Sequence, residues 1–313
     1  MSKARQNFCD RVLALRIAVL EASIQPDPTK TLCEQYSARL LRNGLCVMCY
    51  CCLEDFLKAR CAEVANELCR GAIPFVNLPK KMQKSATLGV IQAMSMREKL
   101  VRKNGGNAAA FLQEHAKSVA STCGAGYTIS SLAFGFDKSN LGYQDLENMA
   151  KCFSVEGIWS QTAAIASRLG LGAAVDYKLA FISAGSNRHA AAHDPSADIE
   201  VTVLSSILME SIAIAIGFDS IITIRTKEMV SKHDWDTLDT SGVHNRFLIR
   251  SIKYRLGKSE YAEYAEYIEN RTKAIKISKQ LPESIRVALP RAYKNNELLV
   301  VLDSRGQPME WYL

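Results

Sequence analysis

The chain has 313 residues, of which 48% are hydrophobic, and its formal net charge is +7. This length and apolar content suffice to bury a real core, so the composition indicates a globular, soluble protein. The sequence also contains no internal repeat or low-complexity tract. Because the N-terminus shows no signal-sequence core and polar residues interrupt the most apolar stretch (residues 201–218), we expect a cytoplasmic protein without a membrane span.

Helical periodicity dominates the first part of the chain. Apolar residues at three- and four-residue spacing predict a helix over residues 8–24, which ends at the Pro26-Asp27-Pro28 breaker. A long helix is predicted from about residue 34 to residue 70. We expect its buried side to consist of Leu41, Leu45, Met48, Cys52, Phe56 and Leu57. Two further helices are predicted over residues 86–103 and 108–121.

Eight of the ten cysteines precede residue 70, and most of these lie on the long helix, where they cannot easily pair. This distribution favours reduced, small core residues. Cys46 and Cys49 formally make a CxxC motif, but a zinc site needs a second such pair at suitable spacing and the sequence has none. Core packing is therefore the preferred interpretation, with metal or redox chemistry as the alternative, and no cofactor is expected.

The basic excess of the chain is mostly N-terminal, and one cluster of Lys and Arg follows Pro79. The cluster comprises Lys80, Lys81, Lys84, Arg97, Lys99, Arg102 and Lys103. Such a group can track an RNA backbone by releasing counterions, so we predict an RNA-binding surface here. An ordinary solvated face of a loop and a helix would have the same composition.

The middle of the chain alternates loops and helices. Residues 127–137 have a loop-like composition, and helices are predicted over residues 143–152 and 160–169. A strongly apolar helix is predicted over residues 199–218, with Asp198 as its N-cap.

Between these helices lies the segment Arg188-His189-Ala190-Ala191-Ala192-His193, which combines a permanently cationic guanidinium with two imidazoles. In a helix, His189 and His193 share a face, whereas Arg188 lies about 140° around the axis from His193. A single chain is therefore not expected to complete a catalytic site alone. Two alternatives remain: the Arg and His side chains serve as a helix cap or structural ion pair, or the two histidines ligate zinc, although no HExxH glutamate accompanies them.

The composition changes beyond about residue 220. Residues 221–224 are β-branched and suit either a short strand or the end of the preceding helix, and residues 226–241 resemble a linker. An amphipathic part follows over residues 246–279, and residues 298–312 predict a β-hairpin. The amphipathic part interleaves aromatic and basic side chains, namely Lys253, Tyr254, Arg255, Tyr261, Tyr264, Tyr267, Arg271, Lys273 and Lys276.

These aromatic and basic residues would suit RNA contact by stacking and charge. The tyrosines at positions 261, 264 and 267 recur every three residues, however, which suits a helix packed on a neighbour, and we favour partner or self-association.

The order of these features resembles the HEPN superfamily, and within it the RiboL-PSP-HEPN group. The landmarks are an acid within the long helix (Leu53-Glu54-Asp55-Phe56-Leu57), a Ser-Asn pair after an aromatic-glycine loop (residues 134–140), the turn Gly157-Ile158-Trp159, and the Arg-x4-His segment before an apolar helix. The match covers roughly residues 30 to 220. It implies a mainly α fold: a HEPN-like antiparallel helical bundle over residues 1–225, with a small α+β region over residues 226–313 that ends in the hairpin.

The resemblance implies a metal-independent endoribonuclease that acts as a homodimer, with the Arg/His segments of two subunits facing each other. His193 is then the general base or acid and Arg188 stabilises the charged transition state. His189 is either the second proton carrier or the residue that orients the phosphate. Glu54, with Asp55 as the alternative, would pair with Arg188 and hold its rotamer.

Two functional hypotheses follow. The first is a ribonuclease of a toxin–antitoxin or phage-defence system, restrained by an antitoxin or defence-system partner until it is triggered. The second is a non-catalytic helical module that binds RNA or a partner protein and uses the same surface for dimerisation.

Overall fold

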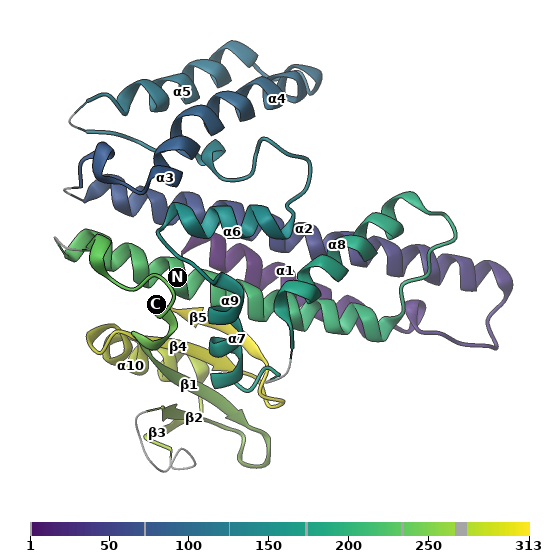
Figure 1. Ribbon diagram of the computed structural model, residues 1–313. Coiled ribbons are helices and arrows are strands. Elements are labelled where there is room, and N and C mark those ends of the chain that lie inside the picture. The colour runs from purple at the N-terminus through teal and green to yellow at the C-terminus, as the bar shows by residue number, and fades with distance from the viewer. Residues whose placement is uncertain (1, 72, 125, 173–174, 233–234, 267–273) are drawn as a thin grey trace. The chain divides into compact units, whose positions relative to one another are not determined.

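The computed structural model describes residues 2–71, 73–124, 126–172, 175–232, 235–266 and 274–313. The protein is mainly helical, with a small mixed sheet of five strands near the C-terminus (Figure 1). This confirms the predicted class, a mainly α protein with a small α+β C-terminal part.

The chain forms two compact units. The first comprises residues 1–53, 159–220 and 244–313, and the second comprises residues 54–158 and 221–243. The sequence predicted a different division, into domains of residues 1–225 and 226–313. That division describes which segments fold on their own, which contacts within the structure do not test, so it stays a prediction.

The helices of the first unit begin and end at recognisable local signals. α1 spans Lys3–Val19, earlier than predicted, because the Ser2 side chain accepts a hydrogen bond from the backbone N–H of Arg5 at 3.2 Å and caps the helix. Helices α7 (Ile158–Arg168), α8 (Tyr177–His193) and α10 (Leu281–Lys294) also belong largely or wholly to this unit.

The second unit contains shorter helices. α3 spans Lys80–Lys84 and leads through a π-helical turn, Ser85–Gly89, into α4, Val90–Lys103. α5 (Ala108–Ser121) and α6 (Tyr143–Cys152) have the predicted bounds. Single 3-10 turns in the two units are Ala22–Ile24, Phe75–Asn77, Ser131–Ala133, Trp235–Thr237, Val243–Asn245 and Leu256–Lys258.

Two helices pass from one unit into the other. α2 spans Leu32–Arg70, which confirms the long helix, but the expected inward position of Leu41 and Met48 is wrong because both are about half exposed. The neighbouring Arg42 and Asn43 are buried instead. Both side chains donate hydrogen bonds to the loop before α9. Two polar residues of α2 therefore point inward, although hydrophobic periodicity predicts that only apolar residues do so.

α9 spans Val201–Ser231 and is longer than the helix predicted over residues 199–218. Ile221 and Ile222 are fully buried, and this packing overrides the strand preference of β-branched residues, so residues 221–224 are helical. Asp198 accepts hydrogen bonds from Arg42 and the helix begins only at Val201. By length and composition α9 is able to cross a membrane, but 61% of its most apolar stretch is buried inside the protein, so the location of the protein stays a prediction.

The C-terminal sheet has the strand order β3-β2-β1-β4-β5. The strands are β1 (Leu248–Arg255), β2 (Glu260–Ala265), β3 (Lys276–Ser278), β4 (Glu297–Leu302) and β5 (Pro308–Tyr312). β1 and β4 are parallel, whereas the other neighbouring pairs are antiparallel. The predicted hairpin is therefore confirmed as β4–β5.

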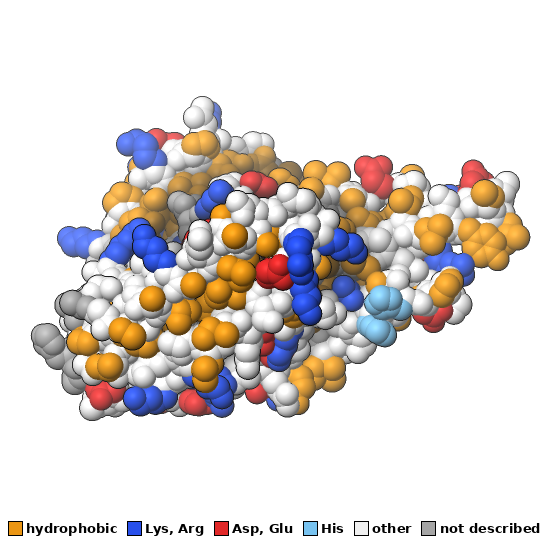
Figure 2. Space-filling view, turned by 90° about the horizontal axis from the view of Figure 1, so that it is seen from above, with side chains coloured by type: hydrophobic (Ala, Val, Ile, Leu, Met, Phe, Trp, Pro, Cys, Tyr) orange, Lys and Arg blue, Asp and Glu red, His pale blue; other side chains and the backbone are white. Residues whose placement is uncertain are grey.

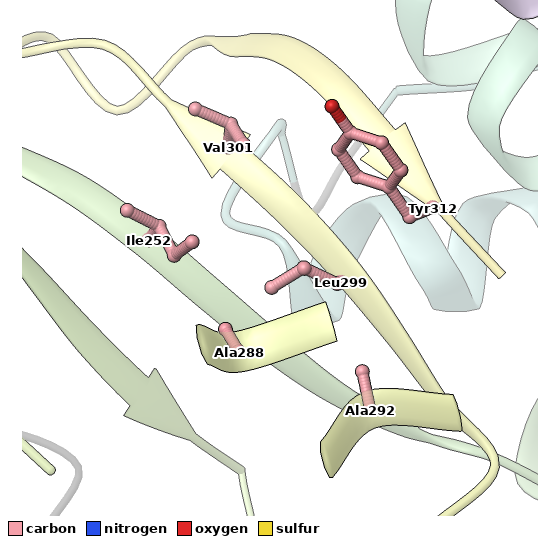
Figure 3. Packing of buried hydrophobic residues seen from close by; sticks show 6 residues of the cluster. All are labelled: Ile252, Ala288, Ala292, Leu299, Val301 and Tyr312. Atoms are coloured by element: carbon pink, nitrogen blue, oxygen red, sulfur yellow. The ribbon is translucent and has the colours of Figure 1, made fainter. Parts of the chain in front are cut away.

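Helix α10 covers one face of this sheet (Figure 3). Its alanines Ala288 and Ala292 lie against Ile252, Leu299 and Val301, and all five side chains are buried. Small residues on the helix let it approach the branched side chains of the strands closely.

The helix suggested by the tyrosine spacing near residue 260 is wrong, because Tyr261 and Tyr264 lie in strand β2. In a strand, positions three apart point to opposite faces. Tyr261 accordingly packs with the α10 side, whereas Tyr264 lines a pocket with Arg168 and Lys253. Of the remaining aromatic and basic residues named for this part, Tyr267, Arg271 and Lys273 lie outside the described residues.

Candidate active site

The Arg188–His193 segment forms the last turns of α8. The Asp176 side chain caps the start of this helix by accepting hydrogen bonds from the backbone of Lys178 and Leu179, both at 3.0 Å. The helix ends at His193, and the side chain of Asp194 then turns the chain by accepting from the Ser196 backbone N–H at 2.8 Å.

The two histidines are adjacent and exposed. The ring centroids of His189 and His193 lie 4.8 Å apart, with their planes inclined by 51°, which confirms that they share a helix face. Figure 2 shows histidine side chains gathered at one place on the surface. Two imidazoles at this separation, open to solvent, can both reach one phosphodiester group.

Arg188 is oriented differently from the histidines. Its side chain is only partly exposed, and its Nε atom is buried and has no hydrogen-bond partner among the described residues. A buried guanidinium nitrogen without a partner is costly, because it has lost water without gaining another acceptor. A phosphate oxygen would supply that acceptor once a change of rotamer turned the Nε atom toward solvent.

Helix α2 positions the end of α8. Asn43 donates to the carbonyl of Ala197 at 2.8 Å and accepts from the backbone N–H of Ile199 at 3.3 Å. Buried Arg42 donates to the Ile199 carbonyl at 3.0 Å and also to Asp198. The loop that follows His193 is thus tied to α2 by buried polar groups, which limits its freedom.

α8 itself packs closely on α2. A Cβ atom on Gly185 would lie 3.2 Å from the Tyr50 hydroxyl, so even an alanine at position 185 would require the Tyr50 ring to shift. One turn earlier, the ring of Phe181 lies 5.5 Å from Tyr50 and 5.6 Å from Trp159. The aromatic contact explains how the Gly-Ile-Trp turn, noted in the sequence, supports the candidate site.

Arg39 of α2 is a residue that sequence reasoning missed. Its Nε atom is also buried without a hydrogen-bond partner among the residues described, and its guanidinium lies 4.8 Å from the Tyr36 ring. Hydrogen bonds from Ser196 lower the pKa of Asp194, and the charge of Arg39 acts in the same direction, so Arg39 lies near the end of α8. No local pattern indicated this, because 149 or more residues separate Arg39 from Arg188 and the histidines in the chain.

Glu54 is buried on α2 within the second unit. Its carboxylate accepts a hydrogen bond from the backbone N–H of Leu141, directly after the Ser139-Asn140 pair. Burial lowers the pKa of Lys58, one turn further along α2, and the charge of Glu54 opposes that shift. Glu54 therefore anchors the loop before α6; its predicted pairing with Arg188 of the other unit stays a prediction, and Asp55 is exposed.

The predicted basic cluster is divided among different environments. Arg97 has a structural role, because its guanidinium donates to the carbonyls of Phe136 and Lys138 at 2.9 and 3.2 Å. Lys81 and Lys84 line a pocket of the second unit. The remaining members, Lys80, Lys99, Arg102 and Lys103, are exposed on α3 and α4.

Metal ligation finds no geometric support in the described ranges. All ten cysteines are free, and Cys46 and Cys49 of the CxxC motif are buried in α2. Within these ranges, no three His, Cys, Asp or Glu side chains are placed so that they could hold a metal together. The pair His189 and His193 therefore has no third ligand among the described residues.

Comparison of the chain with protein-family models, curated proteins and solved structures finds no match in any of the three. The function is therefore argued from the site itself.

Proposed function

We propose that this protein is a metal-independent endoribonuclease, built on a HEPN-like helical bundle, whose active site joins the α8 ends of two copies of the chain. The observation that carries the proposal is the exposed pair His189 and His193, 4.8 Å apart, on a helix end that also holds Arg188, whose Nε has no partner in the part of the chain that the structure describes. Two proton carriers and a free cationic donor are the groups that RNA cleavage requires.

The reaction needs no metal, since RNA carries its own nucleophile. One imidazole, that of His193 or His189, removes the proton of the ribose 2′-OH, and the 2′-oxygen attacks the phosphorus. The bond from phosphorus to the 5′-oxygen breaks, and that oxygen takes a proton from a second imidazole. The products are a 2′,3′-cyclic phosphate and a 5′-hydroxyl end, and DNA, which lacks the 2′-OH, is not cut.

The arginines stabilise the intermediate state of this reaction. The phosphorane carries more negative charge than the diester, and a guanidinium grips two phosphate oxygens at once. Arg188 is the first such group, and Arg39 supplies a second charge close to the end of α8. His189 either carries the second proton or orients the phosphate.

The exposed face of α8 favours pairing of two copies. Leu179, Ile182, Ser186, His189 and His193 follow one another at three- and four-residue spacing, and all are exposed. This places them on one stripe of the helix. A second copy that covers the apolar end of the stripe would bring the imidazoles and guanidinium groups of two chains together.

The test is incubation of the purified protein with labelled tRNA and mRNA in EDTA, with mapping of the cut ends. We expect cleavage that leaves 2′,3′-cyclic phosphates and a rate with a bell-shaped pH dependence, since one imidazole must be neutral and the other protonated. His193→Ala should lower the rate about 10²- to 10⁴-fold.

Ser183→Ala is the matched control, because Ser183 is exposed on the same helix before the histidines. Its rate should equal that of the unchanged protein. Cleavage that persists unchanged in His193→Ala, or that requires a divalent metal, contradicts the proposal.

The second candidate is a non-catalytic module that binds RNA or a partner and dimerises through the same surface. Large exposed apolar side chains on α2, namely Leu40, Leu41 and Met48, favour it, because such residues often mark an interface. Retained dimerisation without any RNA cleavage would select this candidate. An antitoxin-like or defence-system protein that copurifies with the chain would identify what restrains the nuclease.

A further inference from the structure

The second unit contains a cationic pocket that the proposed nuclease does not use. It has a volume of about 180 Å³ and lies between the α3–α4 segment, the loop after Ser131–Ala133 and helix α6. This is smaller than the roughly 300 Å³ at which pockets for drug-sized ligands begin, so a compact ligand fits it.

Three lysines line this pocket. Lys81 and Lys84 lie one turn apart on α3, and neither forms an ion pair within the described residues. Lys138 comes from the loop before α6 and pairs with Asp145. The carboxylate of Asp145 also accepts a hydrogen bond from the backbone N–H of Gly142 at 2.8 Å, so both of its oxygens have partners other than Lys81 and Lys84.

The remaining wall is polar and contains one further acid, so three lysines and two carboxylates line the pocket. Ser85 and Asn148 contribute neutral donors and acceptors, and Asp137 is the other acid of the lining. Burial lowers the pKa of Lys58, and the charges of Glu54 and, more weakly, Asp137 oppose that shift. The thiol of buried Cys152 has two acceptors within reach, the Asn148 carbonyl at 3.3 Å and Ser85 Oγ at 3.4 Å, and burial raises its pKa to about 11, so the thiol is neutral.

The backbone leaves this space open. The π-helical turn Ser85–Gly89 widens the helix at the pocket wall, and such turns are frequent at functional sites. A Cβ atom on Gly89 would meet nothing closer than 3.8 Å, so the pocket beside Gly89 is not filled by neighbouring side chains.

From this geometry we propose that the pocket binds the phosphate group of a small phosphorylated molecule, with Lys81 and Lys84 as its principal ligands. The shared chemistry is a phosphate dianion, which comes from a phosphomonoester or from free inorganic phosphate. The site shares no residue with the α8 histidine pair, and it assigns Lys81 and Lys84, which the sequence placed in a predicted RNA-binding cluster, to a small phosphorylated ligand.

Calorimetric titration of the full chain with ribose 5-phosphate, inorganic phosphate and ribose tests this. We expect ribose 5-phosphate to bind with 1:1 stoichiometry and ribose not to bind. Lys81→Gln and Lys84→Gln should each weaken binding about tenfold or more, because each removes a charge-assisted contact. Lys117→Gln, an exposed lysine of α5 outside the pocket, is the charge-matched control and should leave the affinity unchanged.

Gly89→Met provides a test that does not depend on charge. Gly89 has helical backbone angles, so methionine fits the helix and its side chain fills the pocket. Binding should be lost while the melting temperature is kept or raised.

Inorganic phosphate that binds as tightly as ribose 5-phosphate would support the site and assign free phosphate as its ligand. The proposal is overturned by the absence of binding of either phosphate compound at millimolar concentration, or by binding that Gly89→Met leaves unchanged. A 5′-phosphorylated oligoribonucleotide that competes and binds more tightly than ribose 5-phosphate would overturn the small-molecule assignment in favour of RNA.

Discussion

At the scale of single residues, burial determines the chemistry of the cysteines. Cys9 and Cys49 are buried, and desolvation raises the pKa of each thiol to about 12; the pKa of Cys46 is raised to about 11 in the same way. A thiol held in its neutral form is a poor nucleophile and a poor metal ligand. Cys46 and Cys49 of α2 therefore act as small core residues, as the crowding of cysteines on that helix predicted, and Cys9 of α1 does the same.

The raised pKa values make the protein sensitive to alkali. Between pH 9 and about 11, the unfolded chain releases thiol protons that the folded chain retains, so the free energy of unfolding falls as the pH rises. Below pH 9 this contribution is fully present. Urea unfolding in reducing buffer at pH 7.5 and at pH 10 should show lower stability at the higher pH.

Cys46→Ala should reduce this pH dependence, whereas Cys123→Ser should leave it unchanged because Cys123 is exposed. Equal slopes for all three proteins would show that the buried thiols are not responsible. The same burial predicts that alkylating reagents modify Cys33 and Cys123 first.

Residue identity alone did not determine which side of α2 is buried. Arg42 and Asn43 are buried because they satisfy the backbone of the loop at residues 197–199, while Leu41 and Met48 are exposed. Hydrophobic periodicity has no means of representing a polar side chain whose partner is more than 150 residues away.

At the scale of elements, a buried ionic network joins three strands and helix α10. Arg250 of β1 donates to Glu297 of β4 at 2.6 Å and to Glu263 of β2 at 2.5 Å, and all three are at most 3% exposed. Arg291 of α10 donates to the second oxygen of Glu263 at 2.6 Å. The network matches the strand order set by backbone pairing, because Arg250 of the central strand β1 contacts an acid on each of its two neighbours.

Arg250→Met should destabilise the protein by about 3–5 kcal/mol, since it leaves two buried carboxylates with one cation between them. Denaturant unfolding followed by circular dichroism measures this loss. Arg286→Met is the matched control, because Arg286 pairs with Glu283 on the exposed side of α10 and should cost at most about 1 kcal/mol. Similar losses for both variants would contradict a special role of burial.

Elements with strong local signals in the sequence were predicted correctly, whereas elements without such signals were not. α5 begins after Asn107, whose side chain accepts from the Ala110 backbone N–H at 3.0 Å, and its predicted bounds are confirmed. Strand β2 instead depends on pairing with β1 and β3, which residues 246–279 do not display in their own pattern. Strand pairing is non-local, so three-residue spacing of tyrosines misled the sequence prediction.

At the scale of the molecule, the two ends of the chain meet at one buried acid. Asp219 of α9 is fully buried and accepts hydrogen bonds from Arg5 of α1 at 2.5 and 3.1 Å and from the Trp311 indole of β5 at 2.6 Å. The Trp311 ring also packs edge-on against Phe8 at 6.0 Å. The first helix and the last strand are thus held in the same unit (Figure 1).

Asp219→Ala should cost about 3–5 kcal/mol, because it leaves the Arg5 guanidinium buried without its counter-charge. Chemical unfolding monitored by tryptophan fluorescence measures the loss and reports on the Trp311 environment. Asp10→Ala, an exposed acid on α1, should change stability by less than about 0.5 kcal/mol. If Asp219→Ala lost no more stability than Asp10→Ala, the role given to Asp219 would be contradicted.

The sequence by itself determined the helical class, the bounds of α5 and α6, the C-terminal hairpin and the common face of His189 and His193. These follow from caps, turns and periodicity, which act over a few residues. Only the tertiary structure brought Arg39 near the end of α8, paired Asp219 with both chain ends and gathered Lys81, Lys84 and Lys138 around one pocket. Each of these depends on groups from segments that are distant in the chain, and for Asp219 and Arg5 the interaction gains strength because the fold removes both charges from water.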